Sequence, residues 1–248
     1  LALADAVARF HRDAERRPEH GGHAAMEKIL RDLLAGLDED GKALDPAALA
    51  RFRGASRARL DRDRARLDRR RDQGYVRHVH GDLHLGNVCL WQGRPTLFDA
   101  IEFDEAIACG DVLYDLAFLL MDLMHRDLLA LANAAFNRYL ARVVAEDGVA
   151  SLEGLGLLPL ILSLRAAIRA RVGGAAAEAQ PDPAKAGAKR REAQAYLDLA
   201  LACLDPPEPV LVAVGGLSGT GKSTLAHALA PGIGARPGAA VLRSDVLR

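Results

Sequence analysis

The proline-rich segment at residues 205–209 (DPPEP) divides this sequence into two parts with different patterns. Before it, apolar residues recur mostly at helical spacing, whereas the run VLVAVGG after it is continuous and β-branched, as in a buried parallel strand. Because closely spaced prolines form a stiff linker, we place a domain boundary there. The sequence therefore predicts a mostly helical α+β unit over residues 1–204 and the start of an α/β unit over residues 210–248.

The first unit is expected to contain several helices and a few short strands. Asp45-Pro46 is typical of an N-cap followed by proline at the first helical position, and the helix it starts should run to about residue 71. Its Arg and Asp residues alternate at four-residue spacing, so we interpret it as a solvated face rather than an RNA-binding surface. The other predicted helices cover residues 1–38 (with a break at 17–23), 111–128, 129–145, 155–172 and 189–204. The remaining predictions are a strand at 75–80, a hairpin at 88–103 and a low-complexity mobile loop at 173–189.

The composition disfavours some classes of partner. The 33 basic and 33 acidic residues balance, which argues against a dominant electrostatic interaction with nucleic acid or an anionic membrane. Cys89, Cys109 and Cys203 lack CxxC spacing and fit a reducing compartment. No apolar run approaches the roughly 18 residues that span a bilayer, and no signal segment opens the sequence. We expect a cytoplasmic protein with a small-molecule partner; the sequence does not specify its oligomeric state.

The segment GLSGTGKS at residues 216–223 follows the β-branched run and fits the P-loop pattern G-x-x-x-x-G-K-[ST]. Glycines let the backbone approach phosphate closely, and successive N–H groups then face the anion together with the end of the next helix. A helix over residues 222–230 and a strand over residues 240–245 should complete this part of the α/β unit. Lys222 is expected on the β- and γ-phosphates, and Ser223 on Mg²⁺. The residues expected to bind the nucleotide are Gly216, Ser218, Gly219, Thr220, Gly221, Lys222, Ser223 and Thr224.

The segment VHGDLHLGN at residues 79–87 allows three interpretations. His80 and His84 stand four apart and could bind zinc, although the glycines beside them oppose a helix and no third ligand is apparent. The segment could also be a polar turn without chemistry. The third interpretation is a phosphotransferase catalytic loop, because H-x-D-x-x-x-x-N is the spacing of such loops. Two later features favour it: Asp99 follows a predicted strand, and Asp115 lies within an apolar helix.

Together the segments HGDLHLGN, LFDAIEF and DVLYDLA resemble the aminoglycoside phosphotransferase family and its relatives, the choline and homoserine kinases. The resemblance covers roughly residues 1–204. It implies the C-terminal lobe of a protein-kinase-like fold, and ATP-dependent phosphoryl transfer to a hydroxyl group with Mg²⁺. The roles that it implies are a catalytic base at Asp82, Mg²⁺ ligands at Asn87 and Asp99, structural supports at His80 and Asp115, and no chemistry for His84.

Two departures from the family pattern are visible. Ala100 follows the metal-binding Asp where the family usually has an aromatic residue, and the nearest aromatic side chain is Phe103. This difference predicts a substrate preference unlike that of the drug-modifying enzymes. No segment before residue 75 has the pattern of a kinase N-terminal lobe with its glycine-rich loop, so we expect this chain to be part of a longer protein.

The segment RSDVLR at residues 243–248 resembles P-loop kinases that act on small molecules and polynucleotides. That resemblance implies Asp245 as a catalytic carboxylate facing the phosphate acceptor, and Arg248 as a substrate-binding residue. The whole chain resembles bacterial bifunctional proteins with an aminoglycoside-phosphotransferase-like domain before a P-loop module. It therefore implies a kinase for a small-molecule hydroxyl, with a second ATP site. Two alternatives stay open: a nucleotide-binding regulatory protein without transfer activity, and an aminoglycoside-resistance phosphotransferase.

Overall fold

Local capping signals set the start of several helices in the computed structural model, which describes residues 1–244. The Asp45 carboxylate accepts the N–H groups of Ala47 (3.2 Å) and Ala48 (3.1 Å), and Pro46 occupies the first position of α3 (Pro46–Asp72). An N-cap side chain satisfies backbone donors that have no partner within the helix. The predicted start of α3 is therefore confirmed, and its end lies one residue beyond the expected one.

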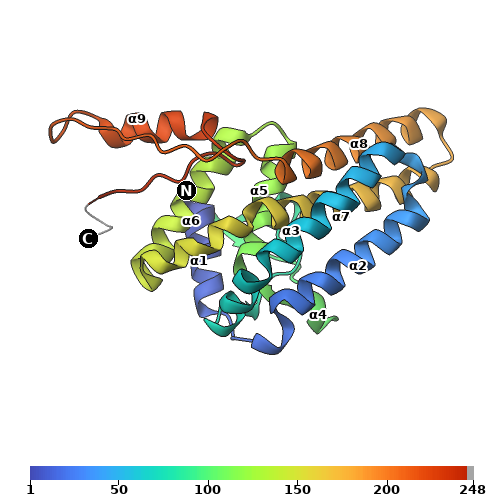
Figure 1. Cartoon of the computed structure of the whole chain (residues 1–248), viewed down its shortest axis with the longest axis horizontal. Coiled ribbons are helices and arrows are strands. Elements are labelled where there is room, and N and C mark those ends of the chain that lie inside the picture. The colour runs from blue at the N-terminus through green and yellow to red at the C-terminus, as the bar shows by residue number, and fades with distance from the viewer. Residues whose placement is uncertain (245–248) are drawn as a thin grey trace.

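Helix α5 (Val112–His125) lies at the centre of the molecule, and every residue from Val112 to Met124 is buried. Around it, α2 (Gly22–Asp40), α3 and α7 (Leu158–Glu178) run side by side (Figure 1). The other long helices of this unit are α1 (Ala2–Asp13), α6 (Leu129–Asp147) and α8 (Pro183–Leu204). Short 3₁₀ turns complete it: η1 (Pro18–His20), η2 (Gly41–Ala43), η3 (Leu85–Asn87) and η4 (Val149–Leu157).

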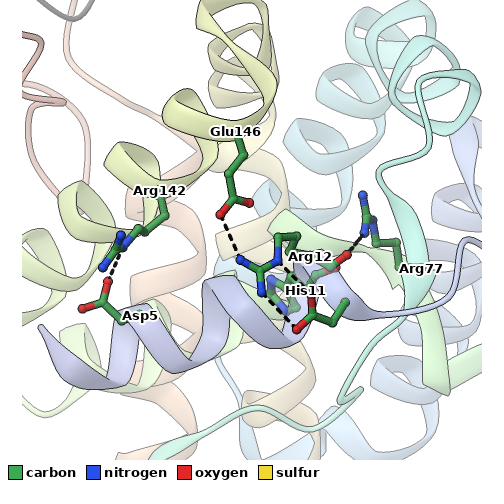
Figure 2. Close-up of polar contacts among 7 residues, drawn as sticks. Asp5, His11, Arg12, Arg77, Arg142 and Glu146 are labelled. Carbon is green, nitrogen blue, oxygen red and sulfur yellow. Dashed lines mark hydrogen bonds and ion pairs between the residues drawn. The ribbon is translucent and has the colours of Figure 1, made fainter.

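Helix α1 is attached to its neighbours by charged side chains (Figure 2). Asp5 accepts hydrogen bonds from Arg138 (2.8 Å) and Arg142 (2.6 Å) of α6, and Arg12 reaches Glu146 of the same helix at 3.3 Å. These hydrogen bonds, with the charge of the two arginines, outweigh the effect of burial and lower the pKa of Asp5. The Asp5 contacts lie in the first turn of α1 and the Arg12 contact lies in its last turn, so both ends of the helix are attached to α6, and His11 between them is buried.

Two small antiparallel sheets flank the segment at residues 79–87. Strand β1 (Val76–His78) pairs with β4 (Cys109–Asp111), and α4 (Glu105–Ala108) precedes β4. Strands β2 (Val88–Trp91) and β3 (Arg94–Leu97) form the predicted hairpin around Gln92 and Gly93, whose φ values of 49° and 73° are those of a tight two-residue turn. The predicted short strand and hairpin are both confirmed.

The prediction of a mobile loop at residues 173–189 is wrong. Helix α7 continues to Glu178, and α8 begins at Pro183 with Asp182 as its N-cap. A Cβ added at Gly173 would lie 3.1 Å from the Cβ of Ala193, so the small side chains allow the two helices to approach closely. Alanine also has the highest helix propensity, and the Ala-rich composition that suggested low complexity instead forms a helical hairpin.

The interpretation of α3 as a fully solvated charged face is also wrong in part. Arg59 pairs with Asp63 at 2.6 Å as the four-residue spacing predicted, but Asp63 is buried. Arg70 is buried as well, and its guanidinium binds both carboxylate oxygens of Asp111 at 2.6 and 2.8 Å. Such a bidentate pair is shielded from water and fixes geometry. It ties the end of α3 to the residue that caps α5.

The chain after residue 204 does not form the predicted opening of an α/β unit within the described residues. Helix α9 (Lys222–Leu229) and the turn η5 (Ala230–Gly232) are present, but residues 210–216 and 240–244 form no strands. Leu211 is 97% exposed, so this apolar run is not buried. A strand needs a hydrogen-bonded neighbour, and the described residues place none beside either segment. The backbone around Ala239 instead crosses α6, on the side of the molecule away from α4 (Figure 1). Asp245 and Arg248 lie outside the described residues.

One helical stretch, Val149–Glu178, is long and apolar enough to cross a membrane by length and composition. This differs from the prediction that no such run exists. In its most apolar window, 67% of the residues are buried inside the protein, as in a core helix. Its apolar side chains pack against α5 and α8, and this burial in the core explains why the stretch is so apolar.

Candidate active site

Asp115, near the start of α5, holds the backbone of the segment 79–87. Its Oδ1 accepts the N–H of Gly81 at 2.9 Å, and its Oδ2 accepts the N–H of His80 at 3.2 Å. Asp115 is fully buried, so these N–H groups replace the hydrogen bonds that water would otherwise donate to its carboxylate. Gly81 has a φ of 79°, which glycine adopts without strain, and this lets the chain turn immediately before Asp82. The contact that the resemblance implied for Asp115 is present.

Asp122 holds the other end of the same segment from one face of α5. Its Oδ2 accepts the N–H of Leu85 at 3.0 Å, and only 4% of the residue is exposed. The sequence analysis missed this residue. The available signal was its position seven residues after Asp115 in an otherwise apolar helix, which places both carboxylates on one helix face.

His11 of α1 lies behind Asp115 and was also missed. Its Nε2 is 3.0 Å from Asp115 Oδ2, and its Nδ1 is 2.9 Å from the Tyr139 hydroxyl. Burial raises the pKa of Asp115, but the hydrogen bond and charge of His11, with the charges of Arg165 and His80, outweigh it, so the pKa lies below its usual value. No sequence pattern links His11 to this site, because 104 residues separate it from Asp115.

Asp82 itself is half-buried and is held by two side chains. Asn87 Nδ2 donates to Asp82 Oδ2 at 3.0 Å, and also to the Asp82 carbonyl. His84 was expected to take no part, yet its Nε2 lies 3.3 Å from the same carboxylate oxygen. Its Nδ1 accepts the N–H of Gly86 at 3.0 Å, so the ring proton is on Nε2 and faces Asp82. The contacts with Asn87 and His84 use only Oδ2, and the Oδ1 of Asp82 has no hydrogen-bond partner among the described residues.

Asp99 is brought beside this loop by His80. The His80 Nε2 donates to the Phe98 carbonyl at 2.9 Å, and the N–H of Ile101 donates to the His80 carbonyl at 3.0 Å. Two residues, Asp99 and Ala100, lie between Phe98 and Ile101. Asp99 is exposed and has a φ of 62°, a conformation that costs energy for a side-chain-bearing residue. Two contacts with His80 thus enforce a strained backbone at a predicted metal ligand.

The oxygen atoms in this region are of the type that Mg²⁺ binds. Asn87 uses its Nδ2 for Asp82, and its Oδ1 is without a hydrogen bond in the described part of the chain. The carboxylate of Asp99 likewise has no partner among residues 1–244. Hard divalent cations prefer carboxylate and amide oxygens, so the residues fit this metal.

The zinc interpretation of His80 and His84 finds no support in the geometry. The Nε2 of His80 contacts the Phe98 carbonyl. Both ring nitrogens of His84 are also occupied, Nδ1 by the Gly86 N–H and Nε2 by Asp82. Within the described residues, the group that could supply three metal ligands is instead His20, Glu105 and Cys109, where Glu105 also pairs with Arg17 at 2.8 Å. The two histidines of the loop therefore act through hydrogen bonds.

A cavity of about 910 Å³ opens beside Asp82. It lies between α2, α7 and the segment from Ile101 to Asp111, and Asp82 and Gly81 form part of its wall. Its volume is in the range of small-molecule sites. The cavity is therefore large enough for a small molecule, and the Asp82 residue lies at its wall.

The predicted P-loop residues form a glycine-rich turn before α9. Gly219 and Gly221 have φ values of 79° and 81°, and Gly221 precedes the first residue of the helix. Thr220 donates to the Leu217 carbonyl at 2.8 Å, and Lys222 Nζ donates to the same carbonyl. The turn is exposed, and it is not brought near Asp82 by any contact in the described residues. The described residues thus show a glycine-rich turn and the helix that follows it, without the strand that the P-loop prediction required before them.

A buried helix that holds a loop in which an Asp and an Asn stand five residues apart is the arrangement of a kinase-like phosphotransferase fold. The chain belongs to the phosphotransferase enzyme family (APH), whose sequence profile matches residues 1–155. It is also 28% identical over its whole length to the uncharacterized proteins Rv2004c of Mycobacterium tuberculosis and Mb2027c of Mycobacterium bovis. The chain spans about half, 47%, of the length of these relatives. No solved structure matches it.

Proposed function

We propose that this protein transfers a phosphoryl group from ATP to the hydroxyl group of a small molecule bound beside Asp82. The observation that carries the proposal is the open Oδ1 of Asp82 at the wall of the cavity, with its Oδ2 fixed by Asn87 and His84. A carboxylate held in this way can accept the hydroxyl proton while the acceptor oxygen attacks phosphorus.

In the proposed reaction a bond forms between the acceptor oxygen and the γ-phosphorus, and the bond from that phosphorus to the β-phosphate oxygen breaks. The hydroxyl proton passes to Asp82, and ADP leaves. Mg²⁺, when bound, neutralises phosphate charge. Asn87 Oδ1 and the Asp99 carboxylate would hold it. Asp115 and Asp122 keep the loop in place, because they bind its backbone at both ends.

The test is Asp82→Asn in the full-length protein. We expect it to lower kcat by about 10²- to 10⁴-fold, the usual contribution of a general base, with little change in nucleotide affinity. The matched control is Asp61→Asn, the same change on an exposed position of α3. Turnover would be followed as ADP release with a panel of small alcohols. Full activity in Asp82→Asn would contradict the proposed role.

We also propose a second nucleotide site at residues 216–224. It is supported by the positive φ of Gly219 and Gly221 and by a helix that begins at Lys222, since such turns present N–H groups to phosphate. Calorimetry of Mg-ATP binding to full-length protein should give two sites, of which Lys222→Ala removes one and Asp82→Asn neither. A single site that is unaffected by Lys222→Ala would refute this second site. Tight binding without product over hours would favour the regulatory alternative.

A further inference from the structure

Arg165 of α7 is a buried cation in the wall of the cavity beside Asp82. Only 6% of the residue is exposed. Its Nε donates to the Tyr114 carbonyl at 3.1 Å, and its guanidinium lies over the rings of Tyr114 (3.8 Å) and Phe118 (4.8 Å). Among residues 1–244, no carboxylate lies within 4 Å of it, and its two Nη groups have no hydrogen-bond partner.

Two other basic residues of the wall, Lys28 and Arg171, are paired with carboxylates. Lys28 pairs with Asp32 at 2.9 Å, and Arg171 pairs with Asp40 at 3.0 Å. Arg169 also lines the cavity, but it is only half-buried, and its guanidinium lies 5.7 Å from the centre of the Tyr196 ring. A guanidinium taken out of water is unfavourable unless an anion or strong acceptor compensates it. In Arg165 the aromatic rings and the charge of the buried Asp115 offset part of this cost, and the Nη groups remain available for an anionic ligand.

The rest of the wall is largely apolar. Side chains from α2 and α7 contribute Ala25, Met26, Ile29, Ile168 and Val172. Asp82, which the proposed function assigns as the base, provides a carboxylate elsewhere in the same wall. The cavity therefore offers a buried cation, an apolar surface and a base for a hydroxyl group.

We infer that the acceptor is an anionic amphipathic alcohol, that is, a small hydroxy acid whose carboxylate binds Arg165 and whose hydroxyl reaches Asp82. This inference rests on the proposed function for the role of the hydroxyl, but the recognition of the carboxylate by Arg165 is independent of transfer. A planar guanidinium can donate two parallel hydrogen bonds to a carboxylate, which gives both strength and orientation. A polycationic drug would instead place positive charge against Arg165.

The experiment measures binding to the full-length protein by calorimetry with three matched series of probes. These are linear hydroxy acids of about four to eight carbons, their primary amides, and the amino alcohols of the same lengths. We expect at least one acid to bind about tenfold or more tightly than its amide, the size of effect given by a charge-assisted hydrogen bond. If no acid is preferred over its amide, or if the amino alcohols bind best, the inference is overturned.

Arg165→Gln should bring the affinity ratio of acid to amide close to one while leaving the amide affinity nearly unchanged. A purely structural role would weaken both probes equally and would overturn the inference. Arg165→Lys keeps the charge and should retain part of the preference, so it decides the question if Arg165→Gln fails to fold. The matched control is Arg142→Gln, an exposed arginine of α6 outside the cavity, which should leave the ratio unchanged.

A parallel turnover assay separates this inference from the proposed function. Selective binding of an acid that Arg165→Gln abolishes, without any phosphorylated product, would refute the proposed function and leave the recognition by Arg165 standing. Phosphorylation of amides or amino alcohols at rates that Arg165→Gln does not alter would support the proposed function and refute the recognition of a carboxylate by Arg165.

Discussion

Asp115 connects three parts of the chain that are distant in sequence: α1 through His11, the loop through His80 and Gly81, and α5, to which it belongs. Each of its partners donates a hydrogen bond to a carboxylate that has no access to water. Hydrogen bonds to a buried charge are worth more than those between neutral groups, and their loss leaves the donors unpaired. A single residue thus controls both the stability of the core and the position of Asp82.

The lowered pKa of Asp115 predicts a specific pH dependence of stability. Because the folded-state pKa lies below the unfolded value of about 3.9, the stabilisation is fully present above that pH and is lost as the pH falls through the lower folded value. We expect Asp115→Asn to reduce the free energy of unfolding by about 3 kcal/mol at neutral pH. Urea denaturation should show this gap shrinking below about pH 4.

The matched control for this measurement is Asp61→Asn, since Asp61 is exposed. It should leave the free energy of unfolding within about 0.5 kcal/mol of the original at each pH. A gap for Asp115→Asn that stays constant or widens as the pH falls would mean that its carboxylate does not carry the stabilisation.

The three cysteines should differ in reactivity. Burial, with a hydrogen bond to Glu105, raises the pKa of Cys109 to about 11, and burial raises the pKa of Cys203 to about 12, whereas Cys89 is exposed. The thiolate is the reactive form, so near pH 8 an alkylating reagent should label Cys89 in the native protein. Mass spectrometry locates the label. Cys89→Ser should abolish native labelling, and rapid labelling of Cys203 would contradict its burial.

At the scale of elements, α5 is the platform of the site. Asp111 caps its start while paired with Arg70, and Asp115 and Asp122 then hold both ends of the loop from one face. All three carboxylates are buried. Polar groups at these positions are costly unless each is paired, so the apolar helix carries acids only where the loop or α3 supplies a partner.

The hairpin of α7 and α8 provides a test of close packing between elements. Ala193 is fully buried, and a Cβ at Gly173 would lie 3.1 Å from its Cβ. We expect Ala193→Leu to destabilise the protein by about 1–3 kcal/mol, because the extra volume forces the helices apart. Ala188→Leu on an exposed position of α8 is the control and should change stability by less than about 0.5 kcal/mol. An unchanged melting temperature in Ala193→Leu would indicate a loose contact.

The sequence predicted those parts of the fold and site whose signals are local. The cap at Asp45, the turn at Gln92 and the spacing of Asp82 and Asn87 each depend on residues within a few positions. What it missed depends on distant partners. His11 and Arg165 join the site only when α1 and α7 pack against α5, and no periodicity indicates that contact.

The errors at residues 210–216 and 173–189 have the same origin. The run at residues 210–216 has the composition of a buried strand, but composition cannot supply the neighbouring strand that pairing needs, and Leu211 is exposed. The residues at 173–189 have the composition of a loop, but α8 offers a surface on which small side chains pack. In both segments tertiary context decides the outcome against the local pattern.

At the scale of the whole molecule, the chain after α8 returns to α6 through two buried asparagines. Asn133 and Asn137 both donate to the Ala239 carbonyl at 3.1 Å, and the N–H of Val241 donates to Asn137 Oδ1 at 2.7 Å. An asparagine amide presents a donor and an acceptor much as a neighbouring strand would. The helical unit thus binds the backbone of the segment that follows the glycine-rich turn, and this contact links the two regions of the chain that lie before and after residue 205.

This contact predicts a defined pattern of amide hydrogen exchange. Asn137→Ala removes the acceptor of the Val241 N–H, so that amide should exchange at least about tenfold faster, the equivalent of one lost hydrogen bond. Gly238→Ala should displace the same segment by a steric clash, without changing the asparagines. Gly238 has a φ of 108°, and an added Cβ would lie 2.5 Å from the Ala230 carbonyl oxygen, so the segment must move. Both variants should therefore accelerate exchange at Val241.

Amides of α5 serve as the internal control for both variants, because α5 is buried and makes no part of this contact. Their protection should remain unchanged. Faster exchange throughout α5 would mean that the substitutions unfold the helical unit as a whole. Unaltered exchange at Val241 in both variants would mean that the asparagines do not hold the segment, and the link between the two regions would then have to lie elsewhere in the chain.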